Sequence, residues 1–75
     1  MPQEQAPFAI IVRQHRKRSG LSQRELAELA GVGMSSVYEI ERGKATVRYE
    51  TLLKVCSVLN ISITFTGPFT DKLSL

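Results

Sequence analysis

The chain has 75 residues, and its ten Lys and Arg against seven Asp and Glu give a formal net charge of +3. A chain of this length forms one small domain and buries only roughly 60% of its unfolded surface, so its core is marginal. The single cysteine excludes an intramolecular disulfide, and no cysteine–histidine set is present to hold zinc. We therefore expect association with a second copy to add stability.

The positive charge is concentrated in the first two-thirds of the chain. Residues 1–48 hold eight Lys and Arg against five Glu, whereas residues 49–75 hold two basic and two acidic residues. A localised basic face is typical of a surface that binds phosphate. The N-terminus lacks the pattern of a signal peptide, and the apolar run at Ala9–Val12 is too short to span a membrane. We expect a protein of the reducing cytosol with no membrane role.

The first helix is predicted from Phe8 to Ser19, after a polar start (residues 1–7) that is expected to fray. Its basic residues cluster toward the C-terminal end, where they suit the helix dipole. Gly20 can adopt the positive φ that ends a helix. The inner face is predicted to hold Phe8, Ile11 and Val12, with Ile10 a further candidate and His15 at the rim; the polar side carries Arg13, Arg16, Lys17 and Arg18.

A second and a third helix follow with almost no connection between them. A capping-box signature, Ser22 and Glu25, begins a helix that ends at about Ala30, before Gly31. After two further residues a third helical pattern covers about Met34–Arg42. So short a connection forces a sharp angle between two short helices, which is the geometry of a DNA-binding helix-turn-helix. The inner residues are predicted to be Leu26, Leu29 and Ala30 in the second helix, and Val37, Ile40 and Glu41 in the third.

A fourth helix is predicted from about Arg48 to Leu59, with Asn60 as its left-handed stop. Its apolar residues recur at helical spacing, and Cys56 is interpreted as a small core residue and not as a redox site. The face that packs inward is predicted to hold Tyr49, Leu52, Leu53, Cys56 and Leu59.

The period then changes from helical to alternating. Residues 61–66 alternate apolar and polar and are predicted to form a strand, whereas residues 67–75 are interpreted as a loose tail. A single strand leaves its backbone hydrogen-bonding groups unpaired, and antiparallel pairing with the same strand of a second copy would satisfy them. The predicted dimer contacts are Ile61, Ile63, Thr64 and Phe65.

The stretch Gln23–Lys44 resembles the phage-repressor-like (Cro/cI, or XRE) helix-turn-helix family. Ala27 is small where the second helix approaches the third, Gly31 lies where the turn needs positive φ, and Glu41–Lys44 gives the typical Glu-Arg-Gly-Lys ending. The match covers about residues 8–60. It implies a mostly α fold: a four-helix lambda-repressor-like domain, here followed by one C-terminal strand that pairs across a homodimer.

The flanks resemble a narrower group, the HipB-type antitoxins of bacterial toxin–antitoxin pairs. These share four helices, a C-terminal strand and a length near this one, and Val12–Gln14 is also similar to them. This resemblance implies a sequence-specific repressor of its own operon in the bacterial cytosol or nucleoid, which binds an inverted-repeat operator and a HipA-like kinase toxin. Two alternatives stay open: a stand-alone phage or chromosomal XRE-family repressor without a toxin, and a module that acts mainly by neutralising a toxin through protein contact.

The resemblance also assigns the DNA contacts, by placing the third helix in the major groove. Met34 can touch a thymine methyl, Ser35 and Ser36 can hydrogen-bond bases or phosphate, and Glu39 can accept from cytosine N4. This helix lacks the Arg and Gln side chains that bind bases through two hydrogen bonds, so we expect modest direct specificity. The groove-facing residues are Met34, Ser35, Ser36, Tyr38 and Glu39, and the phosphate contacts are Gln23, Arg24, Arg42, Lys44 and Arg48.

Several of these residues have a second interpretation. The family resemblance implies that Arg16 forms an ion pair with Glu41 between the first and third helices, and not a DNA contact. Tyr38 alternatively packs on the turn, and Gly33 stands where Ser or Thr is more usual. The basic residues of the first helix either contact phosphate or form a solvated face. With no metal set, nucleophile–base pair or phosphate-binding glycine loop in the sequence, we expect no enzymatic activity, cofactor or metal.

Overall fold

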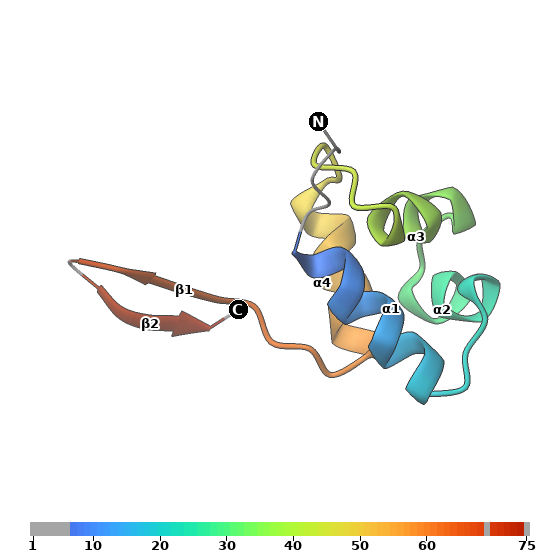
Figure 1. Cartoon of the computed structure of the whole chain (residues 1–75), viewed down its shortest axis with the longest axis horizontal. Helices are drawn as coiled ribbons and strands as arrows, with labels where there is room; N and C mark the ends of the chain where they lie inside the picture. The colour runs from blue at the N-terminus through green and yellow to red at the C-terminus, as the bar shows by residue number, and fades with distance from the viewer. Residues whose placement is uncertain (1–6, 69, 75) are drawn as a thin grey trace.

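The structure, a computed structural model, describes residues 7–68 and 70–74, the last five by their backbone. A bundle of four helices is followed by a hairpin of two strands that extends away from it (Figure 1). The predicted helices are confirmed to within one or two residues at each end, whereas the predicted frayed start lies outside the described residues apart from Pro7. The elements are α1 (Phe8–Arg18), α2 (Gln23–Ala30), α3 (Met34–Glu41), α4 (Tyr49–Val58), β1 (Thr64–Gly67) and β2 (Thr70–Ser74).

The α2–α3 turn is built by local backbone chemistry. The Ser22 hydroxyl accepts from the Glu25 N–H at 3.0 Å, and the Glu25 carboxylate accepts from the Ser22 N–H at 2.8 Å, which confirms the predicted capping box. At the other end of α2, Gly31 adopts a left-handed φ of 71°. The Val32 N–H donates to the Ala27 carbonyl across this turn. α3 therefore begins only three residues after Gly31, at a sharp angle to α2.

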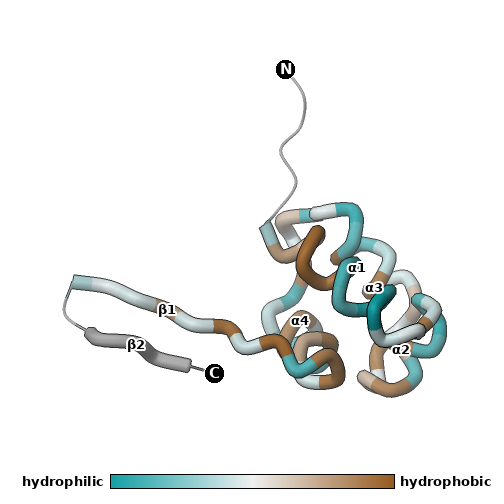
Figure 2. Tube along the Cα trace, turned by 60° about the horizontal axis from the view of Figure 1, so that its bottom comes forward, coloured by the Kyte–Doolittle hydropathy of each residue, from teal (hydrophilic) through white to brown (hydrophobic). Residues whose placement is uncertain are grey.

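The core lies where the four helices meet. Each helix contributes at least one fully buried side chain to it. Burial of this apolar surface is the main stabilising contribution available to so small a domain. Cys56 is buried, as predicted, and this burial raises the pKa of its thiol. Figure 2 shows α1 changing from apolar in its first half to hydrophilic in its second. The core residues are Val12, Leu26, Ala27, Val37, Ile40, Leu52, Val55, Cys56 and Leu59.

The predicted inner faces of α1, α2 and α4 are confirmed in part, at Val12, Leu26, Leu52, Cys56 and Leu59, and are wrong at individual positions. The sequence pattern counted large apolar residues, but small alanines occupy positions in α1 and α2 that are almost completely buried. A close approach of two helices favours a small side chain, so the helix rotates and its larger neighbour turns toward solvent. Exposed contrary to prediction are Ile10, Ile11, Leu29 and Tyr49, and buried in their place are Ala9, Ala27 and Val55.

The C-terminal strand has a partner in its own chain. β1 pairs antiparallel with β2, with Thr64 opposite Ser74 and Thr66 opposite Lys72. The interpretation of residues 67–75 as a loose tail is therefore wrong for residues 70–74, and so is the argument that the strand needs a second copy to pair at all. β2 was missed because its sequence, TDKLS, has neither the β-branched run nor the clear alternation that predicted β1.

The predicted dimer contacts separate into two groups. β1 begins at Thr64, so Ile61 and Ile63 precede the strand, and both are partly buried against the core of their own chain. Phe65, in contrast, is 51% exposed, and its ring centroid lies 6.3 Å from that of Tyr49 on α4. Thr64 is exposed as well. The two isoleucines therefore connect the hairpin to the helical body, whereas Thr64 and Phe65 lie on the hairpin surface.

A nearly buried carboxylate joins α1, α2 and α3. Glu41 accepts from Arg16 Nε at 2.6 Å and from Arg16 Nη2 at 3.0 Å, and Gln23 Nε2 donates to it at 3.2 Å. Arg16 Nη1 also donates to the Leu21 carbonyl at 2.9 Å. The side chains of Arg16 and Glu41 are only 12% and 5% exposed, so the predicted ion pair is confirmed. Burial alone raises the pKa of Glu41, but the hydrogen bonds from Arg16 and Gln23 outweigh it and leave that pKa below its usual range.

Replacing Gly31 by Ser is expected to lower the free energy of unfolding by about 1 kcal/mol, because a Cβ is unfavourable at positive φ. Gly33→Ser is the matched control. Gly33 has an extended backbone, and an added Cβ meets only Ser35 Oγ at 3.7 Å, so serine there should be neutral or stabilising by a few tenths of a kcal/mol. Urea denaturation measures both variants, and equal losses would contradict the assigned turn.

Glu41→Gln is expected to lower the free energy of unfolding by about 2–3 kcal/mol at neutral pH, because the Arg16 charge then loses its counter-ion. The folded state lowers the pKa of Glu41, so this stabilisation is present above the unfolded value, about 4.3, and is lost as pH falls through the folded pKa. The gap between wild type and variant should therefore shrink in acid. Urea denaturation at several pH values measures it, with exposed Glu28→Gln as the control; a gap independent of pH would contradict the account.

Candidate nucleic-acid interface

α3 has one buried and one exposed side. Val37 and Ile40 are fully buried against α1 and α2, whereas Met34 and Tyr38 are each about half exposed and Ser35 is exposed. α3 lies at the end of the bundle away from the hairpin (Figure 1). Of the five predicted groove-facing residues, the structure brings all to the exposed side of α3, although Ser36 and Glu39 are partly buried.

On one flank of α3, a recess of about 210 Å³ lies between this helix and the segment that connects it to α4. α3 lines it with Ser35, Ser36 and Glu39, and the connection contributes Lys44 and Arg48. Glu39 Oε2 lies 3.5 Å from Lys44 Nζ. The carboxylate that was predicted to meet a cytosine is therefore already close to a cation of its own chain, and two of the predicted phosphate contacts, Lys44 and Arg48, lie together beside it.

Arg42 lies between the two flanks of α3. Its guanidinium carbon is 5.5 Å from the centre of the Tyr38 ring, a distance at which a cation–π interaction forms. It is also 3.9 Å from Glu39 Oε1, measured from Nη1. Tyr38 thus packs with Arg42 and remains half exposed instead of folding onto the α2–α3 turn.

The other flank is a recess of about 230 Å³ between α1, α2 and α3. Gln23 lies there at the start of α2, where backbone N–H groups have no partner within the helix. One amide hydrogen of its side chain is donated to Glu41, and the second has no acceptor among the described residues. Its predicted role as a phosphate contact is compatible with this position, whereas Arg24 is exposed on α2 and lines neither recess.

Arg13 is one of three basic residues of α1, with Lys17 and Arg18, whose role the sequence prediction left undecided. It lines the second recess together with Arg16, Gln23 and Tyr38, so the structure brings it to the same flank as residues assigned to DNA. The sequence carried a signal for this position: Arg13 lies three residues before Arg16 and therefore on the same side of α1. This spacing places Arg13 beside α3 only once Arg16 is known to pair with Glu41 of that helix.

Other classes of site find little support in the described part of the chain. Among residues 7–68 and 70–74, no group of three His, Cys, Asp or Glu side chains is placed to hold a metal ion. Within the same residues no helix has the length and apolar character that crossing a membrane requires. What the described structure does present is an exposed helix between two recesses that contain basic side chains.

Known proteins resemble this chain in sequence and in fold. The chain is 38% identical over 63 residues to the uncharacterized HTH-type transcriptional regulator y4mF of Sinorhizobium fredii, a match that covers 84% of this chain and 83% of that protein. Among solved structures, the restriction-modification controller protein C.AhdI from Aeromonas hydrophila matches with a TM-score of 0.65 and 39% identity, covering 72% of this chain and 82% of that one.

HipB structures match over more of the chain but with less identity. A chain of the HipA-HipB-O2-O3 complex matches with a TM-score of 0.74 and 20% identity, covering 91% of this chain and 96% of that one. At this identity the likeness shows the fold alone. The family model for the helix-turn-helix (HTH_3) matches residues 12–65, which is most of the chain. The chain therefore belongs to the helix-turn-helix family and is a transcriptional regulator of the XRE type.

Proposed function

We propose that this regulator is a sequence-specific repressor that inserts α3 into the major groove of double-stranded DNA. The observation that carries the proposal is the exposed side of α3, which lies between two recesses that contain basic side chains. An α-helix fits the major groove, and cations beside it meet the phosphates of the two groove walls. Gln23, Arg42, Lys44 and Arg48 are well placed for that second task, and Arg24 is the most peripheral of the predicted contacts.

The bases would be contacted by the first turn of α3. Met34 offers an apolar contact to a thymine methyl, and the Ser35 and Ser36 hydroxyls offer short hydrogen bonds. Glu39 is less suited to base recognition than its position suggests, because Lys44 and Arg42 lie within 3.5 Å and 3.9 Å of its carboxylate. Direct readout is then modest, and much of the specificity comes from the spacing of two half-sites and from DNA shape.

Recognition of two half-sites requires two copies of α3 and therefore a dimer, and we assign the hairpin as the surface through which the two copies associate. A two-stranded sheet leaves one edge of each strand without a neighbouring strand, and antiparallel pairing of such edges between two copies generates a two-fold axis. The exposed Phe65 ring adds apolar area beside that edge. A two-fold dimer matches an inverted-repeat operator, because each half-site then meets the same α3 surface.

The biological setting divides into two candidates. We propose that the chain is an antitoxin, with a HipA-like kinase toxin as partner and its own operon as target in the bacterial cytosol. A chain of the HipA-HipB-O2-O3 complex matches it over 91% of its length, which supports this proposal. The second candidate is a stand-alone regulator without a toxin, which the higher identity to C.AhdI favours. Co-expression with the product of the adjacent gene distinguishes them: stable co-purification supports an antitoxin, and a neighbour with no toxicity and no binding excludes it.

Binding to the DNA upstream of its own gene should exceed binding to random DNA of the same length by about 10³-fold or more, and both should weaken steeply as salt rises. Ser35→Ala combined with Tyr38→Ala should reduce this preference at least about tenfold, since both side chains lie on the exposed side of α3. Ser57→Ala, on the exposed side of α4, is the control. Equal affinity of the wild type for both DNAs, measured by fluorescence anisotropy, would refute specific repression.

Removing residues 64–75 should convert the dimer to a monomer in sedimentation and weaken operator binding at least about 100-fold, because two half-sites are then no longer linked. Ile61 and Ile63 remain and still cover the core, so the helical body should stay folded. Removal of residues 1–6 is the control. A truncated chain that remains dimeric would contradict the hairpin assignment and point to the apolar surface between α2 and α4, which includes Leu29, Leu53 and Val58.

A further inference from the structure

The recess between α1, α2 and α3 has an excess of positive charge. Of the groups that line it, Arg13, Arg16 and Arg42 are cationic and Glu41 is the one carboxylate. Arg16 is held by Glu41 through two hydrogen bonds, so these two charges compensate each other within the protein. Arg13 and Arg42 are the other two guanidinium groups at this opening of about 230 Å³. Arg42 Nη1 also lies 3.9 Å from Glu39 Oε1, a carboxylate that lines the other recess.

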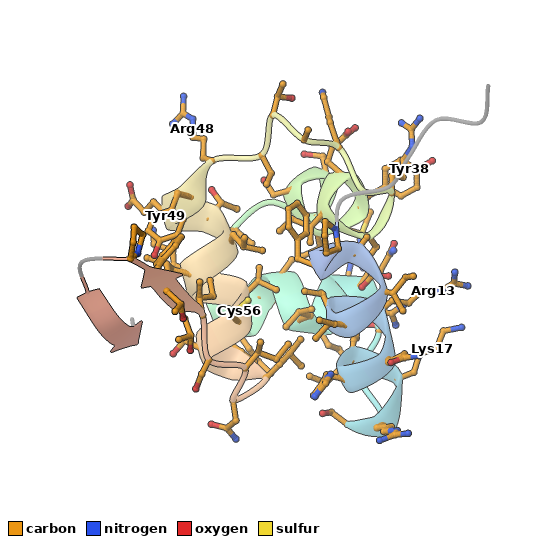
Figure 3. The ribbon with its side chains drawn as sticks, turned by 60° about the vertical axis from the view of Figure 1, so that its left-hand side comes forward. Arg13, Lys17, Tyr38, Arg48, Tyr49 and Cys56 are labelled. Carbon is orange, nitrogen blue, oxygen red and sulfur yellow. The ribbon has the colours of Figure 1, made fainter. Side chains whose placement is uncertain are left out.

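Arg13 has no partner of its own in the described part of the chain. It is exposed and forms no hydrogen bond or ion pair with residues 7–68, although its charge contributes to the lowered pKa of Glu41. Figure 3 shows Arg13 on the same side of the molecule as Tyr38, with Lys17 one turn farther along α1 and farther from Tyr38. Arg13 therefore places at the recess a charge that acts on Glu41 at a distance but forms no hydrogen bond or ion pair with the described residues.

Arg42 faces the same opening in a restricted position. The Tyr38 ring lies beneath its guanidinium at 5.5 Å, which limits the conformations available to a long side chain. Two guanidinium groups at one opening suit a phosphate better than a base edge, because a phosphate is negatively charged and its oxygens can accept hydrogen bonds from both groups at once. Gln23 lines the same opening, and its second amide hydrogen has no acceptor among the described residues.

We propose that Arg13 and Arg42 together bind one phosphate of the DNA backbone at this recess, so that α1 forms part of the DNA interface. The proposal rests on the proposed function only in requiring that the protein binds duplex DNA. A phosphate contact is independent of sequence, so Arg13 contributes equally to operator and random DNA. It adds a contact on the α1 side of α3, opposite Lys44 and Arg48 on the other flank.

The test compares Arg13→Gln with Lys17→Gln, which removes the same charge from the same helix at a position that does not line the recess. Fluorescence anisotropy measures Kd for a random duplex and for the upstream DNA over a series of salt concentrations. Arg13→Gln is expected to raise Kd for both DNAs about five- to tenfold per subunit, and to reduce the slope of log K against log salt by about 0.9 per subunit. Lys17→Gln should change Kd less than about twofold and leave the slope unchanged.

The outcomes separate this proposal from the proposed function. Equal effects of the two variants, or no effect of Arg13→Gln, would overturn the phosphate site, and a loss confined to the upstream DNA would reassign Arg13 to base recognition. A wild type without sequence preference would refute specific repression, yet the random-duplex series would still decide the role of Arg13. Thermal unfolding checks the fold of each variant. Arg13→Lys keeps the charge and should restore the salt slope with only part of the affinity.

Discussion

The packing of α1, α2 and α3 depends on the ion pair and hydrogen bonds that the Glu41 carboxylate forms with Arg16 and Gln23. This carboxylate lies at the C-terminal end of α3, almost without exposure, and takes hydrogen bonds from α1 through Arg16 and from α2 through Gln23. A buried charge is tolerated only where such partners compensate it, so any rotation of α3 about its axis would leave Glu41 or Arg16 uncompensated. The ion pair thus fixes which side of α3 faces the core and, by exclusion, which side is left exposed, the side that we propose faces DNA.

Gly31 sets the second constraint, because its left-handed backbone lets α3 follow α2 almost at once. Gly31 and Glu41 thus fix the position of α3 at both of its ends, and its first turn lies at the edge of the bundle. Basic side chains lie on both sides of α3: those of α1 on one side, and those of the α3–α4 connection on the other. The hairpin extends from the opposite side of the helical body (Figure 1). DNA binding and dimer formation would then use separate surfaces, and each half-site would meet an equivalent α3.

The sequence predicted most of the fold because its helix signals are local. The Ser22–Glu25 capping box, the glycine stops and the apolar spacing lie within a few residues of the features that they create. The Arg16–Glu41 pair is long-range, and only the family resemblance made it predictable. What the sequence did not predict depends on tertiary fit: the burial of Ala9 in place of Ile10 and Ile11, and a second strand that has no β-branched run. The convergence of Arg13 with Arg42 is of the same kind, since it joins side chains of two helices that pack only in the folded state.

The central claim is that the exposed side of α3, fixed from behind by Glu41, enters the DNA groove. Two-dimensional ¹H–¹⁵N NMR spectra recorded during titration with duplex DNA test it most directly, because they report on every backbone amide. The account predicts the largest shift changes at residues 33–39 and at Gln23, with residues 55–59 of the α4 region nearly unchanged. Unchanged α3 amides, with the changes centred on residues 55–59, would contradict it.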